Sequence, residues 1–300
     1  MGKFYDEIPD FLIKWIEQQK MFWVATAPLS PAGHVNVSPK GYAGTFHVVD
    51  QHRVWYEDLT GSGEPSPSEQ YELRHRIVIG VETISHLRDN GRITILFSAF
   101  EGPPRIVRLF GTGTAHEFGT PEYNELIPIE KRSVGSRSVI VVDVHKVGTS
   151  CGFSIPFYAY KSDRMLLNKI AAPKELVDVK VELAALASCD DQSSEPNPEQ
   201  LPLSDDGLKD YWKNHNAKSI DGLPGLLSSF LSRRIFSEAA ASRDWGEDNV
   251  SISTKTEDPV SKTFAVTQVV DQKLLVGFVL GVVTTGLWIN FATGLRAKVL

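Results

Sequence analysis

The 300-residue sequence predicts a mainly β, α+β fold. Two sets of strand-like stretches lead to this prediction, and turn residues such as glycine and proline separate them. Short strands at such close spacing are typical of a barrel or a sandwich. The shorter stretches are Phe22–Ala27, His34–Ser38, Gly44–Val48 and Arg53–Tyr56, and the longer ones are Ile93–Phe100, Arg105–His116 and Ser138–Val147.

Helices are expected before, between and after these strands. Apolar residues near helical spacing follow Pro9 and predict a helix over Asp10–Gln19. A second helix is expected at Glu82–Asn90, with Gly91 as the residue that ends it. A helical C-terminal extension is expected from Asp163–Ala171, Lys174–Ala187 and Leu208–Asn214.

Two glycines interrupt the second of the long strands. Gly111 and Gly113 indicate a bulge or a close backbone approach, and Gly102 lies in the turn before that strand. A dinucleotide-binding fingerprint is excluded, because no further glycine follows at the required spacing and no helix begins there.

Composition excludes several classes of protein. The net charge of −6 argues against a broad nucleic-acid surface. Only Cys151 and Cys189 are present, which argues against a disulfide framework and fits a reducing compartment. The N-terminus has no apolar run, so no secretory signal is expected and the folded part is placed in the cytoplasm. The histidines have no zinc-binding spacing, so no metal site is predicted.

The stretch from Gly33 to Gly41 combines a strand pattern with polar groups. Val35 and Val37 alternate with polar residues, as in a half-buried strand that Pro39 would end. Ser38 then offers a hydroxyl and Lys40 a cation, so the stretch is suited to a phosphate. The alternative is a strand followed by a surface turn with a solvated lysine.

Several motifs in a fixed order give these residues a context. Phe22 to Ala27, Val35 to Gly41, Val54 to Gly63 and Glu82 to Leu87 resemble the pyridoxamine-5′-phosphate-oxidase-like flavoproteins, which are FMN-binding split barrels. Further stretches are similar to one branch of that group, and the resemblance covers roughly residues 1 to 226. They are Arg105 to Gly111, Thr149 to Phe153, Asn214 and Ser219 to Gly225.

The resemblance implies FMN as cofactor and names the residues that would hold it. Ser38 and Lys40 match the motif that binds the phosphate, and Thr83 lies at the start of a helix, where an anion is favoured. Thr83 has the alternative role of a helix cap, and Asp58 that of a turn residue. The full set of candidate cofactor residues is Ser38, Lys40, Asp58, Leu59, Thr60, Gly61, Ser62 and Thr83.

The resemblance further implies a homodimer and an FMN-dependent oxidoreductase that acts on an unidentified small molecule. Oxidation of a pyridoxamine phosphate is not implied, because no residues for a substrate phosphate are found and a fold does not decide its chemistry. Two alternatives remain. One is a flavin- or haem-binding module without turnover, and the other is a membrane-anchored scaffold with a degenerate cofactor site.

Four parts of the chain are expected. Residues 1–150 form the barrel, 151–232 its helical extension, 233–272 a linker and 273–300 a membrane anchor. Residues 64–80 depart from the spacing of the family between the Gly-Ser-Gly turn and the next helix. They are either a surface loop, which costs little entropy, or translated intron.

The membrane anchor is predicted from the end of the sequence. From Leu274 to Leu295 no charged residue occurs, and about 22 helical residues are enough to span a hydrocarbon core. Gly277 and Gly281 have the spacing of a helix-packing motif. The alternative is a buried helix of the globular domain.

Overall fold

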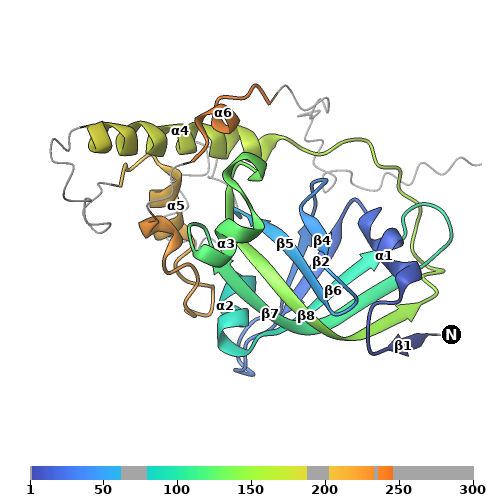
Figure 1. The fold of residues 1–300 in the computed structure, drawn as a ribbon. Helices are drawn as coiled ribbons and strands as arrows, with labels where there is room; N and C mark the ends of the chain where they lie inside the picture. Colours follow the sequence, from blue (N-terminus) through green and yellow to red (C-terminus); the bar gives the residue numbers. More distant parts are fainter. Residues whose placement is uncertain (1, 62–79, 188–202, 233–235, 246–300) are drawn as a thin grey trace, which may run out of the picture. The chain divides into compact units, whose positions relative to one another are not determined.

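A single antiparallel sheet forms the centre of the molecule. The computed structural model describes residues 2–61, 80–187, 203–232 and 236–245. In this part the sheet has eight strands in the order β3-β2-β6-β7-β8-β5-β4, with β1 paired to β8, and it curls into a half-barrel (Figure 1). The strands are β1 Lys3–Tyr5, β2 Phe22–Thr26, β3 Asn36–Lys40, β4 Phe46–Val48, β5 Arg53–Leu59, β6 Arg92–Ser98, β7 Ile106–Glu117 and β8 Ser136–Ser150.

Helices lie at the ends and on one side of the sheet (Figure 1). The prediction of a barrel-like, mainly β fold with a helical extension is confirmed, and every predicted strand is present with shifted ends. The helices are α1 Asp10–Glu17, α2 Glu82–Asn90, α3 Pro121–Leu126, α4 Leu166–Ala187, α5 Leu208–His215 and α6 Glu238–Ala241.

Strands β7 and β8 form the longest ladder, from Ile106 opposite Ser150 to Glu117 opposite Ser138. Its register shifts between Phe110 and Gly111. A side chain at Gly111 would place its Cβ 2.6 Å from the carbonyl oxygen of Asp143. The predicted bulge and close backbone approach are therefore confirmed.

An aromatic cluster brings the two ends of the curled sheet together. The Phe22 ring of β2 lies 5.0 Å from the Phe46 ring of β4 and 5.3 Å from the Tyr56 ring of β5. Phe97 of β6 completes the cluster at 5.7 Å from Phe22. Buried aromatic pairs of this kind contribute about 0.5–1.5 kcal/mol each beyond the burial of their area. The interior of the barrel is thus apolar at this level.

Strand β3 shows the predicted alternation, with its polar side chains turned inward. Val35 and Val37 are 71% and 61% exposed, whereas the polar side chains of Asn36, Ser38 and Lys40 face inward. Pro39 does not end the strand, which continues to Lys40. Strand β3 is at the edge of the sheet, where a residue without an N–H group is tolerated. The predicted alternation is therefore present, and the prediction that Pro39 ends the strand was wrong.

Helix α4 also differs from the prediction, which divided it at Pro173. One helix runs through the proline from Leu166 to Ala187. Pro173 removes one backbone hydrogen bond and is exposed. Ala172 and Glu175, on either side of it, are buried, so packing of this face holds the helix together past the proline.

The buried face of α4 is acidic and meets basic side chains. Glu175 lies 2.8 Å from Arg132, and Glu182 forms an ion pair with Lys209 at the start of α5. Asp178 accepts a hydrogen bond of 3.0 Å from the backbone N–H of Lys209. Asp178 therefore caps α5 from a neighbouring helix, because the cap residue Gly207 has no side chain to do so.

Burial raises the pKa of Asp178 to about 6, although the hydrogen bonds from the α5 backbone and the charge of Lys209 oppose the rise. The folded state thus binds this proton more tightly than the unfolded state does. Its contribution to the free energy of unfolding is largest below pH 4 and is lost as the pH rises through about 6.

We therefore expect Asp178→Asn to remove a pH-dependent contribution. Between pH 7 and pH 5 the wild-type free energy of unfolding should gain about 1 kcal/mol relative to the variant, from the linkage of this proton to folding. Urea unfolding at both pH values measures this. A constant difference between the two proteins would contradict the assignment.

Of the parts predicted after residue 232, the structure describes only residues 236–245. Within the expected linker 233–272, Phe236 and Ala241 are buried, and Phe236 belongs to the hydrophobic core. No helix in the part of the chain that the structure describes is both long enough and apolar enough to cross a membrane. Residues 274–295 lie outside the described residues, so the membrane anchor stays a prediction.

Candidate functional site

An ion pair joins two strands that are far apart in the order of the sheet. The Nζ atom of Lys40, at the end of β3, lies 2.7 Å from Oδ1 of Asp58, near the end of β5. Strand β4 pairs with β5 only from Val54 to Tyr56, so the last residues of β5 are not covered by it. The ion pair closes the half-barrel where no strand pairing does so.

Asp58 is fully buried and has a second cationic partner. Its Oδ2 atom accepts a hydrogen bond of 2.9 Å from Nε of Arg137, which is itself buried. Arg137 also donates to Oδ1 of Asn216 at 2.7 Å and to the carbonyl oxygen of Gly80. Burial alone would raise the pKa of Asp58, but the charges of Lys40 and Arg137 outweigh it and lower that pKa. The alternative of a turn aspartate is therefore wrong.

The three groups together carry one net positive charge, because one carboxylate faces two cations. Arg137 is enclosed, whereas the side chain of Lys40 is 21% exposed. The excess positive charge is therefore accessible from the Lys40 side.

A chain of hydroxyl and amide groups runs from β3 to α2. Ser38 Oγ donates to Oδ1 of Asn36 at 2.8 Å. The Nδ2 group of Asn36 donates to Thr83 Oγ1 at 3.0 Å and to Thr26 Oγ1 at 3.2 Å. Two of the predicted residues, Ser38 and Thr83, are therefore linked through one asparagine side chain.

This chain continues into the interior at His86. Nδ1 of His86 lies 3.0 Å from Thr26 Oγ1, and its Nε2 atom has no hydrogen-bond partner among the described residues. Burial lowers the pKa of His86, while the surrounding carboxylates oppose the shift, with Asp221 the strongest of them. A neutral His86 therefore supports the polar chain from within.

Thr83 does not act as the cap of α2. The cap position is Val81, whose side chain cannot accept a hydrogen bond, and Thr83 is inside the first turn. Among the described residues, the cap position provides no side-chain hydrogen bond to the amides at this end of the helix. Free N–H groups at a helix N-terminus favour an anion, both through hydrogen bonding and through the helix dipole.

The residues after Asp58 form hydrogen bonds with the helical extension. Leu59 pairs with Ser136 at the end of β5. Thr60 Oγ1 donates to the carbonyl oxygen of Gly135 at 2.6 Å and accepts from Nε1 of Trp212 at 2.9 Å.

The next residue, Gly61, accepts a hydrogen bond of 3.2 Å from the hydroxyl of Tyr211 at its carbonyl oxygen. Ser62 lies outside the described residues. The hydroxyl of Thr60 thus has both a donor and an acceptor partner inside the protein, and its role toward a cofactor stays a prediction.

Gly61 and Gly80 lie against each other, although 62–79 separate them in the sequence. A Cβ atom on Gly61 would be 3.1 Å from the Cα of Gly80 and 2.9 Å from its carbonyl oxygen. The chain therefore leaves and re-enters the barrel at one point, as expected for an addition to an existing turn.

We expect that deleting residues 62–79, so that Gly61 joins Gly80 directly, preserves the fold. The melting temperature should stay the same or rise slightly, because a shorter loop costs less entropy to close. Circular dichroism and thermal unfolding measure this, with a Gly-Ser linker of equal length in place of 62–79 as the matched control. An unfolded deletion variant beside a folded linker variant would contradict the proposed junction.

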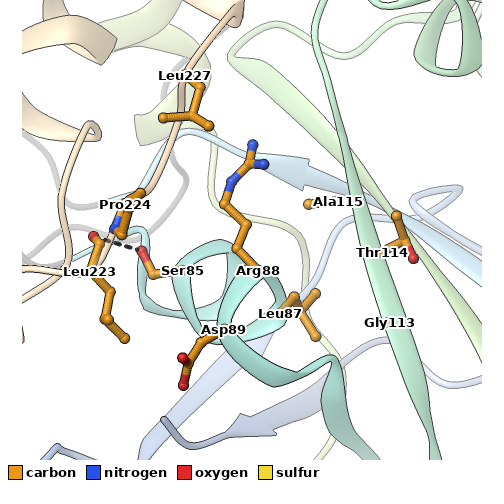
Figure 2. A pocket seen from close by; sticks show the side chains of 10 residues that line it. All are labelled: Ser85, Leu87, Arg88, Asp89, Gly113, Thr114, Ala115, Leu223, Pro224 and Leu227. Carbon is orange, nitrogen blue, oxygen red and sulfur yellow. Dashed lines mark hydrogen bonds between the residues drawn. The ribbon is translucent and has the colours of Figure 1, made fainter. Parts of the chain in front are cut away.

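A hollow of about 540 Å³ lies between α2, β7 and the segment around Leu223 (Figure 2). Three of its polar side chains, those of Ser85, Arg88 and Asp89, have partners within the protein. Ser85 donates to the carbonyl oxygen of Leu223 at 3.4 Å, and Arg88 donates to that of Gly225 and pairs with Glu117. These contacts attach the segment around Leu223 to the barrel. The side chains that make them therefore serve packing within the protein.

The sequence did not single out three residues of the site. The sequence could have identified Asn36, because alternate residues of a strand share a face and Asn36 precedes Ser38 by two. No such pattern identifies Arg137 and Asn216, since Arg137 reaches Asp58 from β8 and Asn216, the residue after α5, accepts a hydrogen bond from Arg137. Only the folded chain brings them together.

Comparisons with known structures and families add the following. No family model matches the chain. Among solved structures, HupZ from Group A Streptococcus is 19% identical, with a TM-score of 0.34, covering 51% of this chain and 99% of that one. A FAD-binding protein from Mesorhizobium loti is 11% identical, with a TM-score of 0.30, covering 50% and 96%. Structural similarities at this level do not show to which family the chain belongs.

A curated relative is decisive. The pyridoxamine 5′-phosphate oxidase family protein ustO from Aspergillus flavus is 34% identical over 248 residues, which cover 82% of this chain and 86% of the relative. The aligned length exceeds the region over which the motifs of the sequence resemble that group. The chain belongs to the pyridoxamine 5′-phosphate oxidase family.

Proposed function

We propose that the chain binds FMN and serves as an FMN-dependent oxidoreductase for a small molecule. One observation supports this most strongly. Asn36 links Ser38 of β3 with Thr83 in the first turn of α2, where the cap residue Val81 makes no side-chain hydrogen bond, so two hydroxyl groups lie beside the first amides of the helix. Membership of the pyridoxamine 5′-phosphate oxidase family agrees with a flavin cofactor.

The residues present fit the phosphate of FMN. A phosphate dianion needs hydrogen-bond donors and positive charge. Thr83 Oγ1 accepts from Asn36, so its own proton is left to donate to a ligand. Ser38 would turn its hydroxyl from Asn36 to the phosphate. Lys40 adds charge, because the cluster with Asp58 and Arg137 keeps one net positive charge.

Bound FMN would supply the redox chemistry, and the chain would supply position and electrostatics. Asn36 fixes the orientation of Thr83, and α2 presents its first amides. Asp58 holds Lys40 at the end of β3 and limits the positive charge there to one. In this proposal the backbone of Leu59 to Gly61, followed by Ser62, provides a second wall.

Assembly and location complete the proposal. Val37 of the edge strand β3 and Val35 just before it are exposed and support a homodimer, since neighbouring exposed apolar side chains mark contact surfaces. The folded part would lie in the cytoplasm, and residues 274–295 would attach it to a membrane.

The test is the binding of FMN to the full-length protein, followed by flavin absorbance and fluorescence quenching. Loss of one charge-assisted hydrogen bond costs about 1.5–3 kcal/mol. We therefore expect Thr83→Ala to raise the Kd for FMN at least about tenfold. Ser38→Ala/Thr83→Ala should raise it about 100-fold or more by the same conversion.

Thr114→Ala is the matched control, because Thr114 is an exposed threonine of β7 that lies outside the proposed phosphate site. Its Kd should equal that of the wild type. A wild-type protein that does not bind FMN would refute the proposed function. Tight binding that Ser38→Ala/Thr83→Ala leaves unchanged would refute the phosphate site alone.

A further inference from the structure

Helix α5 of the helical extension contacts the barrel at the turn that follows β5. Nε1 of Trp212 donates a hydrogen bond of 2.9 Å to Thr60 Oγ1. The hydroxyl of the preceding residue, Tyr211, donates to the carbonyl oxygen of Gly61 at 3.2 Å. Two successive side chains of one helix therefore hold two successive residues of a turn that lies 150 to 152 positions earlier in the sequence.

The indole ring of Trp212 is restricted by other rings. Trp212 is fully buried, and its ring centre lies 5.7 Å from that of Phe118 and 5.8 Å from that of Phe236. A buried indole N–H group is costly unless it finds an acceptor. Because the surrounding rings restrict its orientation, the N–H group of Trp212 is directed at Thr60.

Thr60 is held from its other side by Gly135. Both the hydroxyl and the backbone N–H of Thr60 donate to the carbonyl oxygen of Gly135, at 2.6 and 2.7 Å. The backbone N–H of Gly135 in turn donates to Oε1 of Glu175 on α4 at 2.7 Å. The turn after β5 is thus held by α5 directly and by α4 through Gly135, and these contacts involve neither β3 nor α2.

The residue that follows α5 contacts the charged cluster. Oδ1 of Asn216 accepts a hydrogen bond of 2.7 Å from Nη1 of Arg137, whose Nε group binds Asp58. Asn216 is fully buried, and its Nδ2 group has no hydrogen-bond partner among the described residues. A buried donor without a partner lowers stability, so packing alone does not explain an asparagine here. The acceptor that it offers to Arg137 does explain it.

The other end of α5 is attached to α4 (Figure 1). Asp178 of α4 accepts a hydrogen bond of 3.0 Å from the backbone N–H of Lys209. The ammonium of Lys209 pairs with Glu182 of α4 and donates to the carbonyl oxygen of Ser232 at 2.6 Å. Helix α5 is therefore fixed at its start, at Trp212 in its middle and at the residue after its end.

We propose that Trp212 and Asn216 are positioning residues of the cofactor site. Trp212 acts through Thr60 on the turn that forms the second wall. Asn216 acts through Arg137 on the cluster around Asp58. In this proposal neither side chain touches the cofactor. The role in binding FMN rests on the proposed function, whereas attachment of the turn to α5 does not.

The physical basis of this role is preorganisation. A ligand binds more tightly where the groups that receive it are held in place before binding, since less conformational entropy is then lost. Without the hydrogen bond from Trp212, the hydroxyl of Thr60 and the backbone of Gly61 would reach further conformations. Affinity would then fall although no direct contact to the ligand is removed.

The test is the binding of FMN to full-length variants, followed by flavin fluorescence. Trp212→Phe keeps an aromatic ring and removes the N–H group, and it should raise the Kd about tenfold through loss of one hydrogen bond. Trp245→Phe is the matched control, because Nε1 of Trp245 has no hydrogen-bond partner among the described residues. It should bind FMN like the wild type. An unchanged Kd for Trp212→Phe would refute the role of Trp212.

A double-mutant cycle separates positioning from general destabilisation. If Trp212 acts through Thr60, Thr60→Val/Trp212→Phe should bind FMN with the same Kd as Thr60→Val. Fold-changes that multiply would show that Trp212 acts by another route and would refute the proposal. Tyr211→Phe removes only the hydroxyl bonded to Gly61 and should raise the Kd about threefold, so the test does not depend on the folding of one variant.

A second arm tests Asn216. Asn216→Ala should raise the Kd for FMN about fivefold and leave that for riboflavin, which lacks the phosphate, unchanged, because the cluster supplies charge to the phosphate. Asn214→Ala is the matched control, since Asn214 is exposed and bonds only to Asp210 of the same helix among the printed side-chain contacts. Equal effects of Asn216→Ala on the two ligands would refute the role of Asn216.

Amide hydrogen exchange of the ligand-free protein distinguishes failure of this inference from failure of the proposed function. Trp212→Phe should speed exchange at least about tenfold in the peptide that contains Thr60 and Gly61, and Trp245→Phe should not. This acceleration in a protein that binds no FMN would refute the cofactor and support attachment of the turn by α5. Unchanged exchange in Trp212→Phe would refute that attachment, whether or not FMN binds.

Discussion

The buried carboxylate of Asp58 is the constraint around which this fold is arranged. A charge removed from water is costly unless it is paired and hydrogen-bonded. Here Lys40 reaches it from one edge of the sheet and Arg137 from the neighbouring strand, so both sides of the charge are compensated. The pairing works only if β3 and β5 stay close. The half-barrel is thus closed by an ion pair at one level and by the Phe22 cluster at another.

Closure at Lys40 also determines what β3 presents to the interior. Because side chains alternate along a strand, an inward Lys40 requires inward Ser38 and Asn36. Asn36 then meets Thr83 at the start of α2, and the proposed phosphate site follows from the same geometry. The apolar side chains of the strand are left outside. The polar side chains of β3 therefore face inward and its apolar ones outward for one reason, which is that Lys40 must place its charge beside Asp58.

Local pattern predicted seven of the eight strands, the helices α1, α2 and α5 and the bulge at Gly111, because each depends on nearby residues. It did not predict β1, α3 or α6. Ser38 and Thr83 were identified from motifs, and the structure joins them. The buried face of β3 could not be predicted, since alternation gives two faces but not which one is inside. The course of α4 through Pro173 and the partners of Asp58 depend on tertiary contacts from distant segments, which a single sequence does not show.

The most direct measurement is a double-mutant cycle on Lys40 and Asp58 by urea unfolding. Asp58→Asn leaves two cations facing each other and should lower the free energy of unfolding by about 3–5 kcal/mol. Lys40→Met/Asp58→Asn removes that repulsion and should be less destabilised than the sum of the single variants by about 1–3 kcal/mol. Additive effects, or an Asp58→Asn variant as stable as the wild type, would contradict closure of the barrel by this pair.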